Sequence, residues 1–374
     1  MQQKAGTTNP TKRKIKPAVL AAVAILGLAA YFAARALFVA PPDAKAERDA
    51  YKLGTIVRIT AYGPDAERLG RSLDWALTDG VTRLENELSV NIASSELSRI
   101  NRATLDRRVA VVKDVRPDTG FLVARALTLS RETGGAFDPT IYPVVRLWGI
   151  GTDHAHVPTG AQIADERARV GWDCVSVIKT GKFYEISIGS AERKKMALDL
   201  GGIAKGYVAD VVAEMLRGSG VKCALIDLGG NIYAIGRAPQ GRPWKLGIQH
   251  PDKPRGEYFG ILEAEDVSVV TSGPYERFFI KDGVRYHHIF DPKTGRPASS
   301  DLASVSIVSR NSATADALCT ALFVMGFDKS VKFLTAHRDV EAILLRGDRT
   351  VFITEKLKPS FTLADPSMKL ETFK

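Results

Sequence analysis

The sequence places a carboxylate and a hydroxyl at a spacing suited to one face of a helix. Asp316 and Thr320 lie in the segment NSATADALCTALFVMG, where Asn311 or Ser312 can cap the start of an amphipathic helix. Their i, i+4 spacing puts both oxygens on one face, which is otherwise made of Ala and Leu. Because burying such groups unsatisfied is costly, we expect them to hold a hard cation such as Mg²⁺ or to bond to the backbone of a neighbouring loop.

Two adjacent glycines form the second candidate site. The segment MALDLGGIAKGYVAD (Met196–Asp210) combines them with an acid and a lysine where a strand-like run meets an expected helix. Such glycines let backbone N–H groups and a helix N-terminus close on an anion, so a phosphate is the first expectation. The spacing is neither GxGxxG nor GxxxxGK[ST], so it indicates neither a dinucleotide-binding fold nor a P-loop.

A doubled histidine provides the third candidate. His287 and His288 lie in RYHHIFDPKTGRP, directly before a segment (Asp291–Gly295) whose composition by itself predicts a turn. In an alternating strand the two rings face opposite ways, so at most one of them points into a given cleft. A neutral imidazole in that cleft could accept a proton or contact a phosphate.

A fourth segment, GGAFDPTIYPVVRLWGIG, combines an aromatic ring, an acid and flexible backbone. Phe137 could stack on a planar ligand while Asp138 accepts hydrogen bonds from it. The alternative is a buried Phe beside a turn-forming Asp.

The strands and helices that must position these residues follow one another in no regular order. The periodicity predicts a strand over 55–62 and several short strands from Val175 onward. Helices are expected over residues 64–88, 118–132, 202–216 and 312–325. Because strands and helices do not alternate as regular βα units, we expect an α+β fold rather than a doubly wound sheet.

The N-terminal residues predict a membrane anchor. The basic residues of 1–16 account for about half of the formal net charge of +10, and the rest of the chain shows no basic pattern typical of nucleic-acid binding. Residues 17–40 are almost entirely apolar, about the length that crosses a bilayer as a helix. The charges favour a cytoplasmic N-terminus and an extracytoplasmic body at the inner membrane. We expect a charged linker over 41–50 and the catalytic body over 51–374; a cleaved signal peptide is the alternative to the anchor.

Seven segments, in this order, resemble motifs of the FAD:protein FMN transferase (ApbE-type) family. They are ELSVNIASSELSRIN, GGAFDPTIYPVVRLWGIG, ALDLGGIAKGYVAD, LIDLGGNIYAIG, TSGPYERFF, HHIFDPKTGRPA and ATADALCTALFVMG. The resemblance implies two intertwined α/β subdomains with an FAD site between them. It also implies an Mg²⁺-dependent enzyme that moves the FMN part of FAD onto a Ser or Thr hydroxyl of a partner protein and releases AMP. The partner would be a subunit of a membrane electron-transfer complex.

The resemblance also implies roles for individual residues. Asp316, Thr320 and the carbonyl of Gly202 would hold the metal, and His288 would accept a proton or contact the reacting phosphate. The FAD site would be lined by Leu53, Asn91, Ala136, Phe137, Asp138, Asp199, Lys205 and Ile289. Asn91 stands where the family commonly has an aromatic residue, and Cys319 stands where some members carry a further acid.

Two other functions use the same residues. With water in place of the protein hydroxyl, the site would be an FAD pyrophosphatase that yields FMN and AMP. A membrane-tethered flavin carrier would bind FAD without chemistry, but it would need no paired cation ligands.

Overall fold

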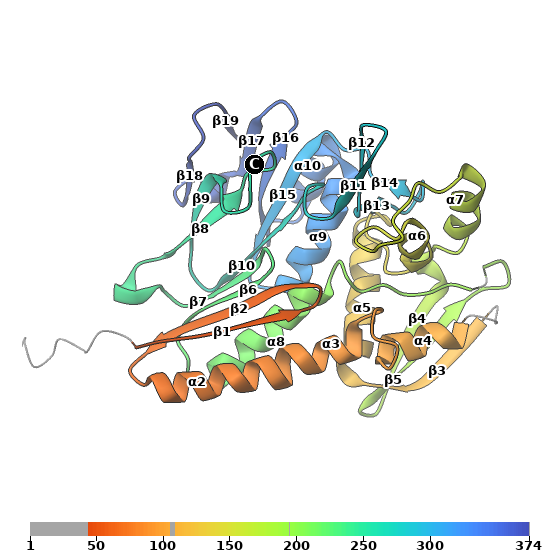
Figure 1. Cartoon of the computed structure of the whole chain (residues 1–374), viewed down its shortest axis with the longest axis horizontal. Coiled ribbons are helices and arrows are strands. Elements are labelled where there is room, and N and C mark those ends of the chain that lie inside the picture. Colours follow the sequence, from red (N-terminus) through yellow and green to blue (C-terminus); the bar gives the residue numbers. More distant parts are fainter. Residues whose placement is uncertain (1–43, 105–108, 194, 374) are drawn as a thin grey trace, which may run out of the picture. The chain divides into compact units, whose positions relative to one another are not determined.

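A nine-stranded sheet runs through the centre of the molecule (Figure 1). The computed structural model describes residues 44–104, 109–193 and 195–373. In spatial order the strands are β1 (Ala44–Lys52), β2 (Thr55–Gly63), β6 (Cys223–Leu228), β7 (Asn231–Ile235), β10 (Val267–Ser272), β15 (Leu302–Ser309), β16 (Glu341–Arg346), β17 (Thr350–Thr354) and β19 (Lys369–Phe373). Neighbouring strands are antiparallel except for the parallel pair β17 and β19.

The described residues include nine α-helices, some of which cover one face of this sheet. They are α2 (Ala66–Trp75), α3 (Arg83–Leu88), α4 (Glu96–Thr104), α5 (Pro117–Glu132), α6 (Tyr142–Trp148), α7 (Gly160–Arg167), α8 (Ala204–Gly218), α9 (Ser312–Met325) and α10 (Phe327–Ala336). A π-helical stretch, Ala76–Thr82, joins α2 to α3 without a break, because the residues on either side keep helical dihedrals. Helix α9 lies against β10 and β15, with α8 and α5 packed beside it. The large hydrophobic core lies between the helices and the sheet.

A second sheet covers the opposite face. Its strands are β18 (Phe361–Leu363), β9 (Tyr258–Ala264) and β8 (Trp244–Gln249). Alternation along the main strands separates the two cores: Ile307 faces the helices, whereas Val308 packs with Phe259 of the second sheet. The cores on both faces leave the main sheet buried except at its edges.

Three smaller sheets surround the helices. One has the order β3 (Val109–Val115), β5 (Phe183–Gly189), β4 (Val175–Thr180), and the others are the pairs β11 (Phe278–Lys281) with β12 (Val284–His287), and β13 (Phe290–Asp291) with β14 (Arg296–Pro297). Short 3₁₀ turns occur at Trp172–Cys174, Pro239–Gly241 and Glu355–Leu357.

Most of the predicted elements are confirmed, but α9 differs in character. Its bounds agree with the prediction, and Asn311 is the N-cap, accepting the N–H of Thr314 at 2.8 Å. The helix is not amphipathic, since Ser312–Phe323 are buried except at Thr320. It lies between the main sheet and other helices, so its side chains are enclosed on every side.

The predicted linker is wrong over most of its length. Residues 44–52 form strand β1, which pairs with β2 along its whole length through a turn at Leu53 and Gly54. Only Ala46 of this edge strand is buried, so its charged side chains gave no alternating hydrophobic pattern. The body therefore includes residues 44–50, which the prediction assigned to the linker.

Residues from Ala44 onward pack as one compact unit around the continuous main sheet, and the division into two intertwined subdomains stays a prediction. The predicted anchor over 17–40 lies outside the described residues. Within the described ranges no helix is both long enough and apolar enough to cross a membrane.

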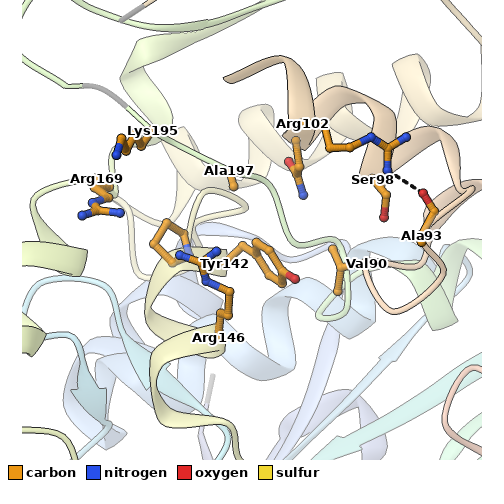
Figure 2. A pocket seen from close by; sticks show the side chains of 11 residues that line it. Val90, Ala93, Ser98, Arg102, Tyr142, Arg146, Arg169, Lys195 and Ala197 are labelled. Atoms are coloured by element: carbon orange, nitrogen blue, oxygen red, sulfur yellow. Dashed lines mark hydrogen bonds between the residues drawn. The ribbon is translucent and has the colours of Figure 1, made fainter. Parts of the chain in front are cut away.

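A pocket of about 490 Å³ opens where α4, α6 and the segment leading to α8 meet (Figure 2). Its wall includes Asn101 of α4, Tyr142 of α6 and Ala197. Ala197 is two residues before Asp199, so the pocket lies beside the glycine segment singled out in the sequence.

Candidate active site

The close crossing of α8 and α9 brings distant sequence motifs together. A Cβ on Gly206 would lie 2.2 Å from the carbonyl oxygen of Ser312, so only glycine permits this approach. One turn further along α8, the two carboxylate oxygens of Asp210 accept the backbone N–H groups of Ser312 and Ala313 at 2.8 and 2.9 Å. Burial raises the pKa of Asp210 to about 6, although these two hydrogen bonds act in the opposite direction. Asp210 thereby fixes the first turn of α9 against α8.

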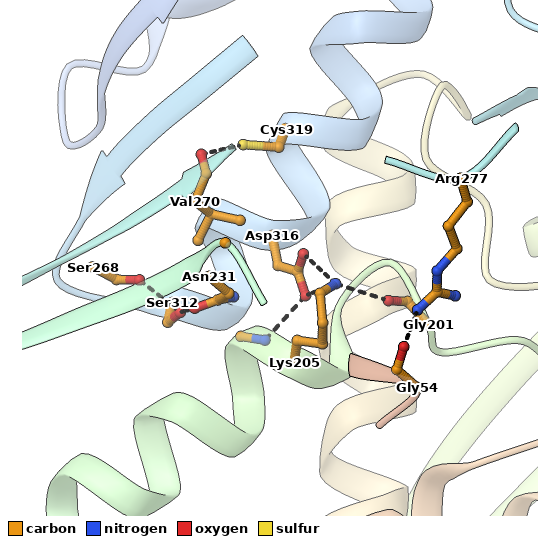
Figure 3. Close-up of polar contacts among 12 residues, drawn as sticks. Gly54, Gly201, Lys205, Asn231, Ser268, Val270, Arg277, Ser312, Asp316 and Cys319 are labelled. Carbon is orange, nitrogen blue, oxygen red and sulfur yellow. Dashed lines mark hydrogen bonds and ion pairs between the residues drawn. The ribbon is translucent and has the colours of Figure 1, made fainter. Parts of the chain in front are cut away.

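Asp316 lies at this crossing, and its carboxylate faces the ammonium of Lys205 (Figure 3). Its side chain is almost completely buried, and the ammonium Nζ of Lys205 lies 3.2 Å from Oδ1 and 3.4 Å from Oδ2. The backbone N–H of Gly206 donates to Oδ2 at 3.0 Å. Lys205 also lies 3.5 Å from the carbonyl oxygen of Gly201. A buried carboxylate thus faces a positive charge beside the paired glycines.

Gly202, Thr320 and Phe137 meet one another at the same place. A Cβ on Gly202 would lie 3.5 Å from Thr320 Oγ1 and 3.2 Å from Cε2 of Phe137. The structure therefore brings together all three residues expected to hold a metal, since Asp316 is one helical turn before Thr320. Within the described ranges no three His, Cys, Asp or Glu side chains gather as a metal-binding group.

Asp199 lies next to these glycines. Its Oδ1 accepts the N–H of Gly201 at 2.7 Å, which closes the turn before α8. Burial raises the pKa of the Asp199 carboxyl, and the nearby positive charges of Arg277 and Lys205 oppose that rise. The structure therefore places an acid, a lysine and an arginine around the paired glycines.

The two histidines have different environments, as the alternation predicts. His287 is buried edge-on against Phe323, its Nδ1 accepts the N–H of Ile289 at 3.3 Å, and its Nε2 donates to the carbonyl of Ala298 at 3.2 Å. Both ring nitrogens are occupied, and burial lowers the pKa of His287. This histidine serves the packing of the strand.

His288 presents one unoccupied ring nitrogen among the described contacts. Its Nδ1 lies 3.2 Å from the carbonyl oxygen of Arg277, which also accepts the His288 backbone N–H at 3.1 Å. A carbonyl cannot donate, so Nδ1 carries the proton and Nε2 carries the lone pair. Burial, with a smaller contribution from the positive charge of Arg277, lowers the pKa of His288 to about 3. The ring is therefore neutral, and Nε2 offers a lone pair.

Arg277 is the residue that sequence reasoning missed. Its guanidinium Nη2 donates to the carbonyl of Gly54 at 3.3 Å, at the tip of the β1–β2 hairpin. A signal for it was present: the Asp282–Gly283 pair is typical of a two-residue hairpin turn, and that register sets Arg277 opposite His288.

The residues expected to contact flavin occupy several environments. Leu53 has φ of 55° in the hairpin turn, and its N–H donates to Glu85 Oε1 at 2.6 Å. Ala136 and Phe137 are buried, and so is Ile289, whose carbonyl accepts the N–H of Ala298 at 2.8 Å.

Asp138 and Asn91 differ from the simple expectation of free polar groups. Both Asp138 oxygens are occupied, one by the N–H and hydroxyl of Thr140 at 2.8 and 2.6 Å and the other by the N–H of Trp172 at 3.1 Å. Burial raises the pKa of Asp138. Asn91 lies in an exposed turn after α3, and its N–H donates to Ser89 Oγ at 3.2 Å. None of the contacts between described residues joins Asn91 to the cluster around Asp316.

Known proteins are similar to this chain over most of its length. The sequence model of the ApbE family matches residues 53–344. The FAD:protein FMN transferase of Treponema pallidum is 35% identical over 333 residues, which cover 85% of this chain and 89% of that protein. The enzyme of the same name from Klebsiella pneumoniae is 35% identical over 286 residues, 76% of this chain and 85% of that protein.

Solved structures of ApbE proteins are similar to this chain in fold. The crystal structure of the ApbE protein from Thermotoga maritima has a TM-score of 0.74 at 29% identity and covers 85% of this chain and 99% of that one. The flavin transferase ApbE from Vibrio cholerae has a TM-score of 0.70 at 29% identity, covering 85% and 100%. With the family match extending over more than half of its residues, this chain belongs to the ApbE family.

Proposed function

We propose that this chain is an FAD:protein FMN transferase, which moves the FMN part of FAD onto a Ser or Thr hydroxyl of a partner protein and releases AMP. Its curated relatives carry the name of this activity. The observation that carries the proposal is the meeting of Asp316, Lys205 and Gly202 beside the neutral, half-buried His288. This arrangement supplies charge stabilisation for a phosphoanhydride together with a proton acceptor.

The oxygen donors at this place fit Mg²⁺. The carboxylate of Asp316, the hydroxyl of Thr320 and the carbonyl of Gly202 would hold it, and all three are the hard oxygen ligands that this ion prefers. Asp316 already faces a positive charge, the Lys205 ammonium, in the structure. One carboxylate leaves coordination positions for water and for the FAD phosphates. When bound, Mg²⁺ would neutralise charge on the pyrophosphate.

The residues of the chain account for the transfer step. The acceptor hydroxyl oxygen attacks the phosphorus on the FMN side of the pyrophosphate, and the bond from that phosphorus to the oxygen retained by AMP breaks. The hydroxyl proton passes to Nε2 of His288. The hydrogen bond from Nδ1 to the carbonyl of Arg277 holds the ring in the orientation for this step. The positive charges of Arg277 and Lys205 stabilise the charge that develops on the phosphate oxygens.

The remaining residues of the proposed FAD site form its walls. The turn at Leu53, the buried Ala136 and Phe137, and Ile289 offer apolar and backbone surface to the ligand. Asp138 orders the loop that contains Trp172, so its contribution is to hold the wall in place. Asp199 and the exposed Asn91 would contact the ligand through their polar atoms.

One incubation tests the proposal: the purified chain, FAD, Mg²⁺ and a candidate acceptor domain, analysed by mass spectrometry. A mass gain of one FMN on the acceptor together with AMP is the expected result. Free FMN and AMP with unmodified acceptor would indicate an FAD pyrophosphatase instead. Intact FAD in every reaction, with flavin still bound to the chain, would leave only a flavin carrier.

We also propose that residues 17–40 tether the enzyme to the inner membrane with its body on the periplasmic side, where the acceptor is a subunit of a membrane electron-transfer complex. The basic residues before an apolar stretch support this orientation. Protease added to intact spheroplasts should digest the body if the orientation is right. A body that is protected until the membrane is broken would refute it.

A further inference from the structure

The pocket beside the site is lined by positive charge. Four of its wall residues are Arg102, Arg146, Arg169 and Lys195, and its wall, as far as the described residues form it, contains no Asp or Glu. Figure 2 shows Arg102 on one side of the pocket, Lys195 and Arg169 on the other, and Arg146 beside Tyr142. Cationic side chains on opposite walls of one concavity favour an anionic occupant.

Among the described residues, part of this charge has no carboxylate partner. Arg169 is paired with Asp165 at 2.6 Å and with Glu166 at 3.2 Å, and Arg146 only reaches Glu166 at 4.0 Å. None of the ion pairs within the described ranges includes Arg102 or Lys195. The guanidinium of Arg102 donates to the carbonyl of Ala93 instead, a neutral partner. Arg102 and Lys195 are both exposed.

The pocket lies beside the segment that carries Asp199 of the proposed active site. Its wall residue Asn101 makes two hydrogen bonds of 2.8 Å with the backbone of Leu198, the residue directly before Asp199. Tyr142, also in the wall, lies close enough to Asp199 for that carboxylate to add to the rise in its pKa that burial causes. A ligand that fills the pocket therefore lies next to the backbone that leads to Asp199.

FAD has no anionic group left for this pocket. Under the proposed function its only phosphates lie at Asp316 and Lys205, and its two ring systems are neutral near pH 7. The other substrate is a protein, which must bring a hydroxyl to His288 and therefore passes over neighbouring surface. On that basis, which rests on the proposed function, we propose that the pocket binds an acidic segment of the acceptor protein through Arg102, Arg146 and Lys195, and so contributes to the choice of acceptor.

The test measures binding without catalysis. A ten-residue peptide with four Asp residues around one Thr is titrated calorimetrically into the full chain in the absence of FAD, alongside the same peptide with Asn in place of Asp. The acidic peptide is expected to bind the unchanged chain in a saturable and salt-sensitive way, and the Asn peptide at least about tenfold more weakly. Replacing Arg102 and Lys195 together by Gln should weaken binding of the acidic peptide about tenfold.

A matched variant removes the same charge elsewhere. Lys329 and Lys332 are exposed residues of α10 and do not line the pocket, so their joint replacement by Gln should leave peptide binding within about twofold. The FAD affinity of both variants, measured by flavin fluorescence, should be unchanged. Equal weakening in both variants, weaker FAD binding in place of weaker peptide binding, or no saturable binding to the unchanged chain would overturn the inference. Because no transfer is measured, these results are independent of whether the chain transfers FMN.

Discussion

At the scale of single residues, identical side chains have different tasks because their surroundings differ. His287 and His288 are adjacent, yet both ring nitrogens of His287 serve the packing, whereas His288 keeps Nε2 available. Asp138 and Asp316 are both buried, but Asp138 is satisfied by a loop, whereas Asp316 faces the ammonium of Lys205. Residue type alone does not assign these roles.

Replacing Asp316 with Asn tests the cation site. The amide keeps an acceptor for the Gly206 N–H, so the packing of α8 on α9 should remain and the melting temperature should change little. Loss of the negative charge should lower the rate of FMN transfer about 100-fold or more, because the charge stabilisation of the pyrophosphate is weakened. Transfer kinetics at saturating Mg²⁺, with thermal melts as the control, measure both effects. Unchanged transfer would rule Asp316 out as a metal ligand.

The pH dependence of transfer tests His288. Its pKa is lowered to about 3, so the ring stays neutral, with a lone pair on Nε2, across the range from pH 5 to 8. The plot of kcat/KM against pH, which reports groups of the free enzyme, should therefore lack an acid limb near pH 6.5. The His288→Gln variant should have a lower kcat/KM at every pH, and the shape of its plot of kcat/KM against pH should be unchanged. An acid limb centred near pH 6.5 that disappears in His288→Gln would contradict the assignment.

At the scale of elements, the site depends on the contact between α8 and α9. Gly206 lets the helices approach, and Asp210 binds the exposed N–H groups at the start of α9. Through this contact α8 carries Lys205 to the Asp316 carboxylate. The expected metal donors thus come from two segments that are more than a hundred residues apart in the chain.

Substituting Gly206 with Ala tests this contact. Its Cβ would lie 2.2 Å from a backbone oxygen, so the helices must separate, and the free energy of unfolding should fall by about 2 kcal/mol or more. Transfer should fall as well, since Lys205 and Gly202 move away from α9. Gly218→Ala, at the end of the same helix where a Cβ meets nothing within 4 Å, is the matched control and should leave both quantities unchanged or slightly raise the stability. Denaturant titrations measure the free energy of unfolding of the two variants. Equal values for both would show that the contact between α8 and α9 tolerates a side chain at position 206.

At the scale of the whole molecule, β1 forms one edge of the main sheet, although its sequence lacks the hydrophobic alternation of a typical strand. Strand β1 pairs with β2 over nine residue pairs, although most of its side chains are exposed. The hairpin also positions Gly54 against Arg277, so this edge of the sheet is connected to the site.

Two truncations test where the body starts. A chain of residues 44–374 keeps β1 and should match the full chain in transfer rate and stability. A chain of residues 51–374 loses most of β1, exposes the hydrogen-bonding edge of β2, and should be less stable by about 2 kcal/mol or more. Denaturant unfolding and transfer assays measure the difference. Equal stability of the two truncated chains would mean that β1 adds nothing to the fold.

The sequence by itself determined the family and the longer helices, whereas the short helices α4, α6, α7 and α10 were not predicted. Short strands with clear alternation and helices with strong caps, such as Asn311 before α9, are local signals, so their positions could be predicted within a few residues. The seven motifs identified the family, and they named most of the residues that meet around Asp316. The edge strand β1 was lost because a strand with one buried residue has no local hydrophobic signature.

Only the tertiary structure decided how these residues are used. Side-chain partners across the chain separate His288 from His287, commit Asp138 to a loop, and bring Arg277 to the site through a hairpin register. The cationic pocket likewise combines α4, α6 and the segment before α8, which no sequence window contains. Protonation, hydrogen-bond occupancy and concavity are properties of neighbours in space, whereas periodicity and motifs are properties of neighbours in sequence.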